Sequence, residues 1–146
     1  MKHKIKTAVC VIIVLAILIP VVLEFGTGHV NKTELEVGTS QMYTEQEIKE
    51  ASKALKLYFF LHMRGFELQE ISYQEEASHF LAQEMTQKGR IKSEKCMIVF
   101  ESKFRKVHGS DNNDAYGEME SGYQWILIRD KEGGRWHIDE SMCGYG

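Results

Sequence analysis

The sequence predicts an α+β domain that follows an apolar N-terminal helix. Three observations predict it: an uncharged apolar run near the N-terminus, two later segments with helical spacing, and strand-like segments near the C-terminus that turn residues separate. Helices that precede a run of strands, without regular alternation, favour α+β over α/β architecture. We therefore expect a signal anchor or signal peptide over residues 1–25, a tether over residues 26–43 and one α+β domain over residues 44–146.

The apolar run is predicted to be a transmembrane helix. Its 17 residues, Thr7 to Leu23, carry no charge, and three lysines precede them. At about 1.5 Å per residue this helix is roughly 25 Å long, slightly short for a bilayer core but long for a signal peptide. The positive-inside rule keeps the lysine-rich N-terminus in the cytoplasm. The predicted location is the cell membrane, crossed once, with the domain outside.

Removal of this helix stays an open alternative. Signal peptidases require small residues three and one positions before the cut, and Gly26-Thr27-Gly28 is a weak match to this pattern. Cleavage near Gly28 would give a secreted domain. Cys10 stands at the start of the apolar run, whereas a lipidated cysteine follows such a run, so we expect it to be an apolar residue of the helix.

The charge of the domain excludes one class of partner. Residues 26–146 contain 15 Lys and Arg and 20 Asp and Glu, since three of the 18 basic and one of the 21 acidic residues precede them, and the net charge is −5. A duplex-binding domain carries a basic face, but here basic and acidic residues are interspersed. We expect no nucleic-acid partner.

Two helices are expected in the domain. The first begins after Thr44, whose side chain can cap the helix while Glu47 reaches back to the cap, and it ends before Gly65. A second, shorter helix is expected from Ala77 to Met85. The apolar stripe of the first helix consists of Ile48, Ala51, Leu55, Tyr58, Phe59 and His62.

Four strands complete the domain. Residues 66–73 alternate with one change of phase, which indicates a strand with a bulge, and a buried strand is expected from Cys96 onward. The clearest strand pattern covers residues 123–130, which a tight turn at residues 131–134 joins to a last strand at residues 136–139. The last three strands should form an antiparallel meander.

This order of elements resembles a known family. The segments at residues 125–130 and 136–139, with the closing Gly144-Tyr145, resemble a family of short, exported, uncharacterised proteins of Gram-positive bacteria. That family is itself similar to the nuclear-transport-factor-like superfamily, which has a cystatin-like fold. The resemblance covers residues 44–146 and implies a cone: two helices packed on a curved antiparallel sheet, with room for a pocket. Members of the superfamily include isomerases and dehydratases as well as proteins that bind or dimerise, so the resemblance implies no single activity.

Aromatic side chains supply most of the candidate ligand-binding residues. Tyr123, Trp125 and Trp136 lie on the last two strands, and His62 lies on the stripe of the first helix. Cross-strand pairing inside the core explains the aromatic group most simply. Rings that stay exposed, including Tyr145, would instead form a binding surface for a partner protein or a carbohydrate.

The alternative to a binding function is an enzymatic one. A histidine that faces an interior pocket beside a carboxylate could transfer a proton. We expect His62 to be partly buried with a hydrogen-bond partner, and His137 to be exposed or at the mouth of the cone. A cavity filled by Phe59, Phe100 and Trp125 would remove this hypothesis. The candidate groups are His62, His79 and His137, with Asp139 or Glu67 as the carboxylate.

No catalytic motif, metal site or cofactor site is predicted. The loop at residues 111–114 begins like a calcium loop, but Tyr116 and Gly122 stand where that loop needs Gly and Glu, so a polar hairpin tip is expected. Cys96 and Cys143 are expected at opposite ends of the meander. About eight residues of strand would hold them more than roughly 20 Å apart, so no disulfide is predicted.

The sequence therefore predicts a membrane-anchored extracytoplasmic protein whose domain binds an envelope protein or a small ligand. Two alternatives stay open: a small pocket enzyme with a His/carboxylate pair, and a structural subunit of a membrane assembly.

Overall fold

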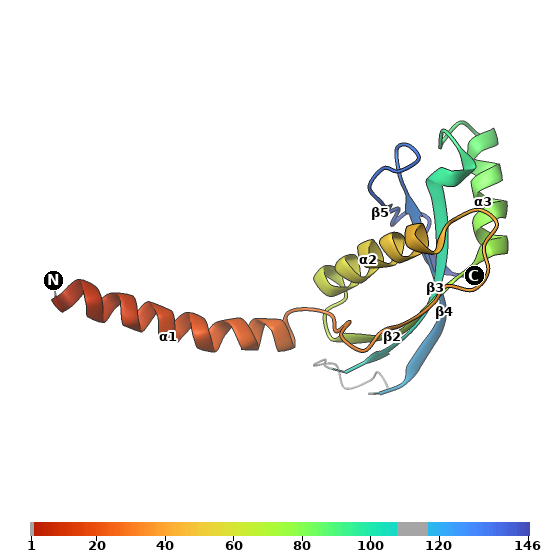
Figure 1. Ribbon diagram of the computed structural model, residues 1–146. Coiled ribbons are helices and arrows are strands. Elements are labelled where there is room, and N and C mark those ends of the chain that lie inside the picture. Colours follow the sequence, from red (N-terminus) through yellow and green to blue (C-terminus); the bar gives the residue numbers. More distant parts are fainter. Residues whose placement is uncertain (1, 108–116) are drawn as a thin grey trace.

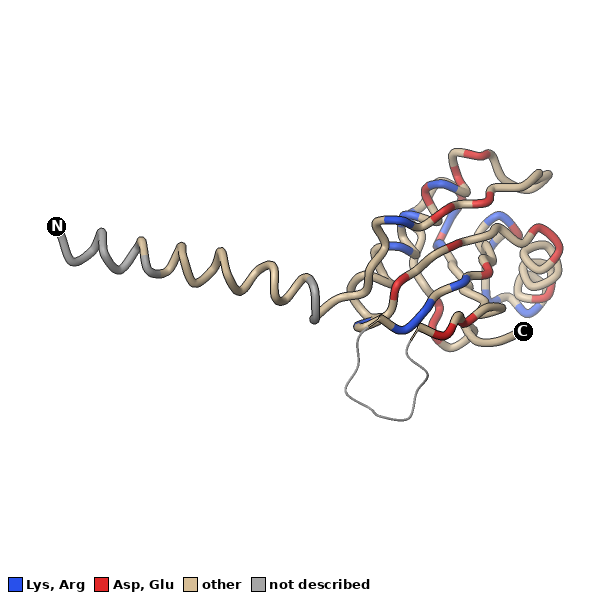
Figure 2. Tube along the Cα trace, turned by 90° about the horizontal axis from the view of Figure 1, so that it is seen from below, with Lys and Arg blue, Asp and Glu red and all other residues tan. Residues whose placement is uncertain are grey.

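Helix α1 (Lys2–Phe25) projects from a domain that contains all the other elements (Figure 1). Figure 2 shows Lys, Arg, Asp and Glu interspersed over the domain and a central stretch of α1 that has none of them. Among the described residues, no helix combines the length and the apolar character that crossing a membrane requires. The computed structural model describes residues 2–107 and 117–146, without the side chains of residues 2–8, 10, 24 and 25.

Helix α2 (Glu45–His62) begins as the sequence predicts. Thr44 Oγ1 accepts a hydrogen bond from Glu47 N at 3.2 Å, and Glu47 Oε2 accepts one from Thr44 N at 3.1 Å, so the capping box is confirmed. The helix ends before Gly65, whose φ of 79° favours glycine. The face that α2 buries contains Ile48, Ala51, Ser52, Leu55 and Phe59.

A six-stranded sheet lies at the centre of the domain. Its strands are β1 (Glu34–Glu36), β2 (Phe66–Tyr73), β3 (Met97–Lys106), β4 (Met119–Ile128), β5 (His137–Ile138) and β6 (Gly144–Tyr145). The neighbour order is β1-β2-β3-β4-β5, and β6 also pairs with β4. Strands β2 to β5 are antiparallel neighbours, as predicted, whereas β1 runs parallel to β2. The α+β class is confirmed, but the sheet is mixed and not wholly antiparallel.

The sheet bends around α2 (Figure 1). Register shifts leave one residue unpaired in β2, between Leu68 and Glu70, and one in β4, Gly122, opposite Ser102 and Lys103 of β3. An extra residue at such a bulge bends the strand and increases its twist. The shift in β2 falls where the sequence alternation changes phase, so the predicted bulge is confirmed.

The two domain helices cover opposite faces of the sheet. Successive side chains of a strand point to opposite faces. Helix α2 therefore packs on the face that carries Phe100 and Trp125, and α3 (Glu75–Gln87) packs on the face that carries Val99 and Ile126. Figure 1 shows the two helices on either side of β3.

The turn between β4 and β5 is also as predicted. Gly134 N donates to Lys131 O at 2.9 Å, and Gly133 has a φ of 72°. The other predicted connection, the polar hairpin tip at residues 111–114, lies outside the described residues.

The segment that follows α1 is bonded to the domain. Gly28 N donates to Phe60 O at 2.9 Å, and His29 N donates to Phe66 O at 2.8 Å. Farther along, β1 extends this contact by pairing with β2. Backbone bonds thus join the chain leaving α1 to both the end of α2 and the start of β2.

Gly28 fits this place because it lacks a side chain. A Cβ there would lie 2.5 Å from Phe59 O and 2.8 Å from Met63 O, both backbone atoms. The tether predicted over residues 26–43 therefore contains ordered structure. Strand β1 was not predicted from the sequence, because its three residues contain one apolar side chain, Leu35, between two exposed glutamates.

Candidate binding surface

Two of the candidate binding residues lie in the core. Trp125 is 2% exposed, and its Nε1 donates to Ser102 Oγ at 2.7 Å. Trp136 is 5% exposed and packs edge-on against Tyr43, with ring centroids 5.9 Å apart. Neither indole is available to a ligand at the surface, so both are corrected from candidate binding residues to core residues.

Four other aromatic side chains lie around the buried ring of Trp125. We call Tyr58, His62, Tyr123 and Tyr145 the aromatic surface. Tyr58 stacks on His62 with centroids 4.3 Å apart and lies 5.9 Å from the Trp125 ring. Tyr123 lies 4.7 Å from Trp125 and 5.2 Å from Tyr145. Helix α2 therefore supplies one half of the surface, β4 and β6 supply the other, and Trp125 contacts both.

The aromatic surface is open to solvent at both ends. Tyr145 is 62% exposed, and His62 is exposed, while Tyr58 and Tyr123 are partly buried. The expectation that His62 is partly buried was wrong, because His62 is the last residue of α2 and stacks on the rim of the surface. Of the four predicted candidates, the structure brings Tyr123 and His62 onto one surface.

Two carboxylates border the aromatic surface. Tyr58 Oη donates to Glu140 Oε1 at 2.8 Å, and Tyr145 Oη donates to Glu120 Oε2 at 3.0 Å. Burial and the bond to Glu140 raise the pKa of Tyr58 to about 12, and burial and the bond to Glu120 raise the pKa of Tyr145. Both phenols are therefore protonated at neutral pH. The surface offers a ligand aromatic faces for stacking and carboxylate oxygens that accept hydrogen bonds.

Cys143 lies against the same part of β4. Its Sγ accepts a hydrogen bond from Ile126 N at 3.4 Å and donates one to Asp139 O at 3.3 Å. Burial raises the pKa of this thiol, so it is uncharged at neutral pH and unsuited to nucleophilic attack.

Both cysteines of the domain are free thiols. Cys96 O accepts a hydrogen bond from Arg129 N at 2.9 Å, which places Cys96 at the predicted end of the meander. Cys143 is level with Ile126, three residues from Arg129 along β4, and not beyond the far end as expected. Along the strand the two cysteines are thus separated by about 10 Å, which corrects the longer separation expected from the sequence.

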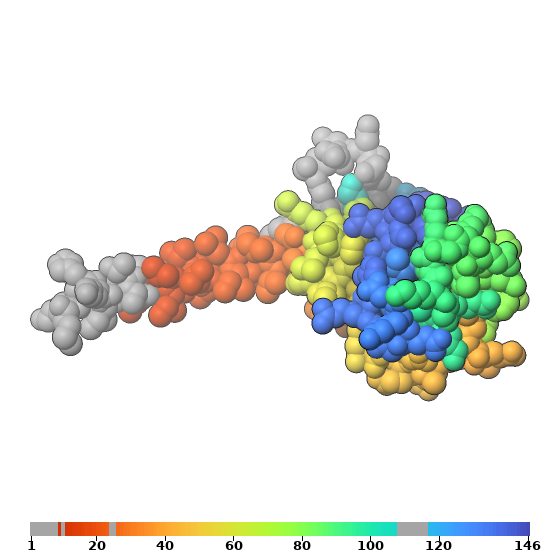
Figure 3. All heavy atoms as spheres, turned by 90° about the horizontal axis from the view of Figure 1, so that it is seen from above, coloured from red at the N-terminus to blue at the C-terminus, as the bar shows by residue number. Residues whose placement is uncertain are grey.

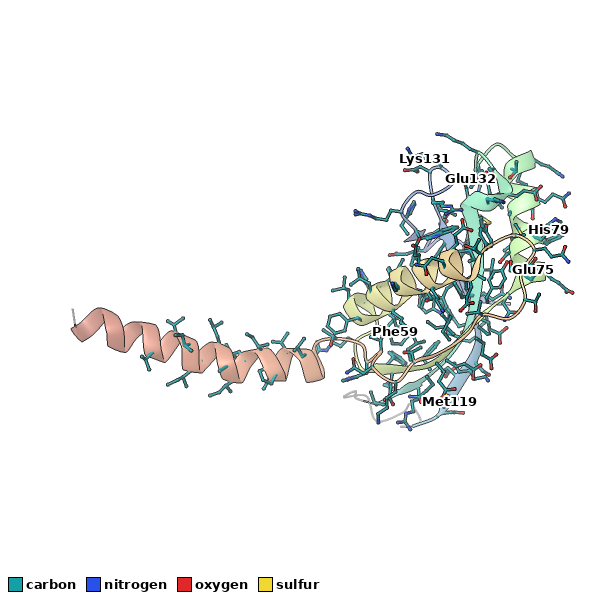
Figure 4. The ribbon with its side chains drawn as sticks, in the orientation of Figure 1. Phe59, Glu75, His79, Met119, Lys131 and Glu132 are labelled. Carbon is teal, nitrogen blue, oxygen red and sulfur yellow. The ribbon has the colours of Figure 1, made fainter. Side chains whose placement is uncertain are left out.

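The histidines of the enzyme hypothesis lie at the surface. His62, His79 and His137 are all exposed, which confirms the expectation for His137. His79 Nε2 lies 3.8 Å from Glu94 Oε2, and Figure 4 shows His79 on the outer side of α3. None of the three faces the interior beside a carboxylate.

The space between α2 and the sheet is filled by large side chains. Phe59 and Phe100 are fully buried, and Trp125 is nearly so. Figure 4 shows Phe59 between α2 and the sheet, at the end of α2 that α1 approaches. These three side chains occupy the position where the hypothesis requires a cavity. Among the described residues, no cluster of three or more His, Cys, Asp or Glu could hold a metal ion.

An ion pair between buried Arg129 and partly exposed Glu47 joins the other end of α2 to the sheet. Arg129 is 3% exposed, its Nη2 lies 3.0 Å from Glu47 Oε1, and its Nε donates to Lys95 O at 2.8 Å. The guanidinium lies 4.3 Å from the centroid of the Trp136 ring. Glu47 thus caps α2 and neutralises a buried cation, which fixes the helix relative to β4.

Sequence reasoning missed three residues of the site: Tyr58, Glu140 and Glu120. The spacing of Tyr58 and His62, four residues apart on one helix, predicts that the two rings meet. The glutamates come from distant segments, and the register of β4 and the path of the chain after β5 place them. No sequence pattern gave this placement.

No protein-family model matches the sequence, and neither a curated protein nor a solved structure is significantly similar to it.

Proposed function

We propose that this protein is a membrane-anchored extracytoplasmic binding module. Helix α1 anchors it in the cell membrane with the N-terminus in the cytoplasm. The domain outside binds an envelope protein or a small ligand through the aromatic surface.

The side chains of α1 support the anchor. Val9 and most of the large apolar side chains up to Leu23 are about half exposed, on every side of the helix. A helix that is apolar all round is stable only when it is buried in protein or in lipid. The whole uncharged run in the sequence, Thr7 to Leu23, reaches the lower limit of length for a membrane span.

The bonds of Gly28 favour an uncleaved anchor over a signal peptide. Gly28 is buried, and its N donates to Phe60 O. A cut after Gly28 would remove this bond and leave a charged amine on His29, whose N donates to Phe66 O. Retention of α1 keeps both contacts.

The aromatic surface is the observation that carries the binding proposal. Tyrosine side chains, which combine an apolar ring with a polar hydroxyl group, are enriched at protein surfaces that bind a partner. The pocket-enzyme alternative lacks its histidine, because His62, His79 and His137 are exposed. Exposed α1 also suits the alternative of a subunit in a membrane assembly, but that role needs no aromatic surface.

Site-specific crosslinking in intact cells tests the proposal. A photoreactive phenylalanine replaces Tyr145, or, as the control, Phe80 of α3, which is similarly exposed at 67%. We expect a discrete crosslinked product from position 145 that the additional substitution Tyr123→Ser abolishes. No product, or equal products from positions 145 and 80, would contradict binding at the aromatic surface.

A further inference from the structure

The outer face of the second half of α2 is apolar and basic. Leu57 and Leu61, one helical turn apart, are 60% and 57% exposed. No Asp or Glu occurs between residues 51 and 65, although the domain is acidic, and the first turn of α2 contains Glu45 and Glu47. The basic residues between positions 51 and 65 are Lys53, Lys56 and Arg64.

This half of α2 is also the part of the domain that meets α1. Only residues 26 and 27 lie between Phe25 and Gly28, and Gly28 N is bonded to Phe60 O. Three extended residues span at most about 11 Å. Figures 1 and 3 show the end of α2 beside the end of α1. An anchored α1 therefore holds this end of α2 close to the membrane surface.

We propose that the outer face of α2, around Leu57 and Leu61, rests on the anionic surface of the membrane that holds α1. This inference depends on the proposed anchor. The two leucines enter the interface between headgroups and acyl chains. Lys53, which is exposed, attracts lipid phosphates, and Lys56, whose Nζ also donates to Thr33 O at 3.3 Å, adds positive charge beside it. The exposed face of α3 does not combine apolar and basic side chains, because its exposed Phe80 lies one helical turn from Glu76 and from Glu84.

Fluorescence quenching of the full chain in lipid nanodiscs tests this contact. Cys10→Ala and Cys143→Ala remove two of the three native cysteines, and the third, Cys96, is buried. Single cysteines are then introduced as Leu61→Cys, as Phe80→Cys for the control, and as Val14→Cys for the anchor. Each carries an environment-sensitive fluorophore, and the nanodiscs contain spin-labelled phospholipid as quencher, with either phosphatidylglycerol or phosphatidylcholine.

Quenching at the three labelled positions distinguishes a failure of this inference from a failure of the proposed anchor. We expect quenching at positions 14 and 61 and none at position 80. Quenching at 14 with none at 61 would overturn the inference and leave the anchor standing. No quenching at 14 would overturn the anchor. A blue shift at 61 without lipid quenching would show that a second protein surface covers α2, which also overturns the inference.

The charge of the lipid gives a second readout. The double variant Lys53→Glu with Lys56→Glu should reduce quenching at position 61 in phosphatidylglycerol nanodiscs more than in phosphatidylcholine nanodiscs. The matched control, Lys92→Glu with Lys131→Glu, changes the same net charge at exposed positions outside α2. Equal loss in the two double variants would contradict a specific contact of α2 with anionic lipid.

Discussion

At the scale of single residues, Arg129 joins three parts of the fold. Its guanidinium contacts Glu47 of α2, the backbone of Lys95 and the ring of Trp136. A buried cation that loses its partners, or a carboxylate that loses its cation, destabilises a fold far more than a broken surface pair does.

We predict that Arg129→Met lowers the free energy of unfolding by about 3 kcal/mol, because Glu47 is left beside a desolvated site. The matched control is Arg105→Met. Arg105 Nη2 lies 2.6 Å from Glu67 Oε2, but the Arg105 side chain is 44% exposed, so its loss should cost less than about 1 kcal/mol. Chemical denaturation of the full chain in detergent micelles measures both values. Similar losses in the two variants would contradict the structural role of Arg129.

The same ion pair predicts how stability depends on pH. Burial opposes ionisation of Glu47, but hydrogen bonds from Thr44 and Arg129 outweigh it and lower the pKa below the ordinary value of 4.5. A group with a lowered folded-state pKa stabilises the fold above its unfolded value, and this contribution is lost as the pH falls through the folded-state pKa. Glu47 therefore stabilises the fold at neutral pH, and this contribution is lost progressively as the pH falls below 4.5 and through the lowered pKa.

We expect Glu47→Gln to be less stable than the wild type at pH 7 and to lose less stability as the pH falls below 4.5. Thermal unfolding between pH 3 and pH 7 by circular dichroism would show the two curves approaching each other at low pH. Parallel curves over the whole range would mean that Glu47 does not titrate with a lowered pKa.

At the scale of elements, the backbone contact at Gly28 joins α1 to the domain. A side chain at this position meets the backbone oxygens of Phe59, in the last turn of α2, and of Met63, the residue that caps the helix, and neither can move without disturbing the end of the helix. A substitution that disrupts this contact therefore tests whether the chain leaving α1 is packed against the domain.

We predict that Gly28→Ala destabilises this junction by about 1–3 kcal/mol, as overpacking in a core does. Hydrogen exchange should increase at His29 and Leu68, whose amides donate across the junction. Gly144→Ala is the matched control, because a Cβ at Gly144 has no atom within 4 Å. Unchanged exchange in Gly28→Ala would show that the junction is not packed as the structure has it.

Elements with strong local signals were predictable from the sequence. The capping box at Thr44, the bulge in β2 and the turn at Gly133 each depend on a few neighbouring residues, and all were confirmed. Strand β1 was not predictable, because it pairs with residues more than 30 positions away and its own three residues, Glu34–Glu36, contain a single apolar side chain.

The candidate site was predictable only in part. His62 and Tyr123 are on the aromatic surface, but Trp125 and Trp136 are in the core, because they face α2 while neighbouring segments cover them. Aromatic residues on one strand are equally suited to a core or to a surface, so only the packing of other elements decides between the two. Glu140 reaches Tyr58 across 82 positions of sequence.

At the scale of the whole molecule, the proposed anchor and the proposed binding surface both adjoin the C-terminal end of α2. Helix α1 leads through residues 26 and 27 to the end of α2, and His62, at this same end, belongs to the aromatic surface. The proposed partner or ligand would therefore be met close to the membrane, on the outer side.

The mass and the cellular fraction of the mature protein, recovered from its own cells, test this account most directly. We predict a chain that retains α1, in the membrane fraction, with the domain digested by protease added outside the cells. A chain shortened to a start near Gly28 and found in the medium would contradict the anchor, and an intact chain in the cytoplasmic fraction would contradict both the anchor and the outward display of the domain.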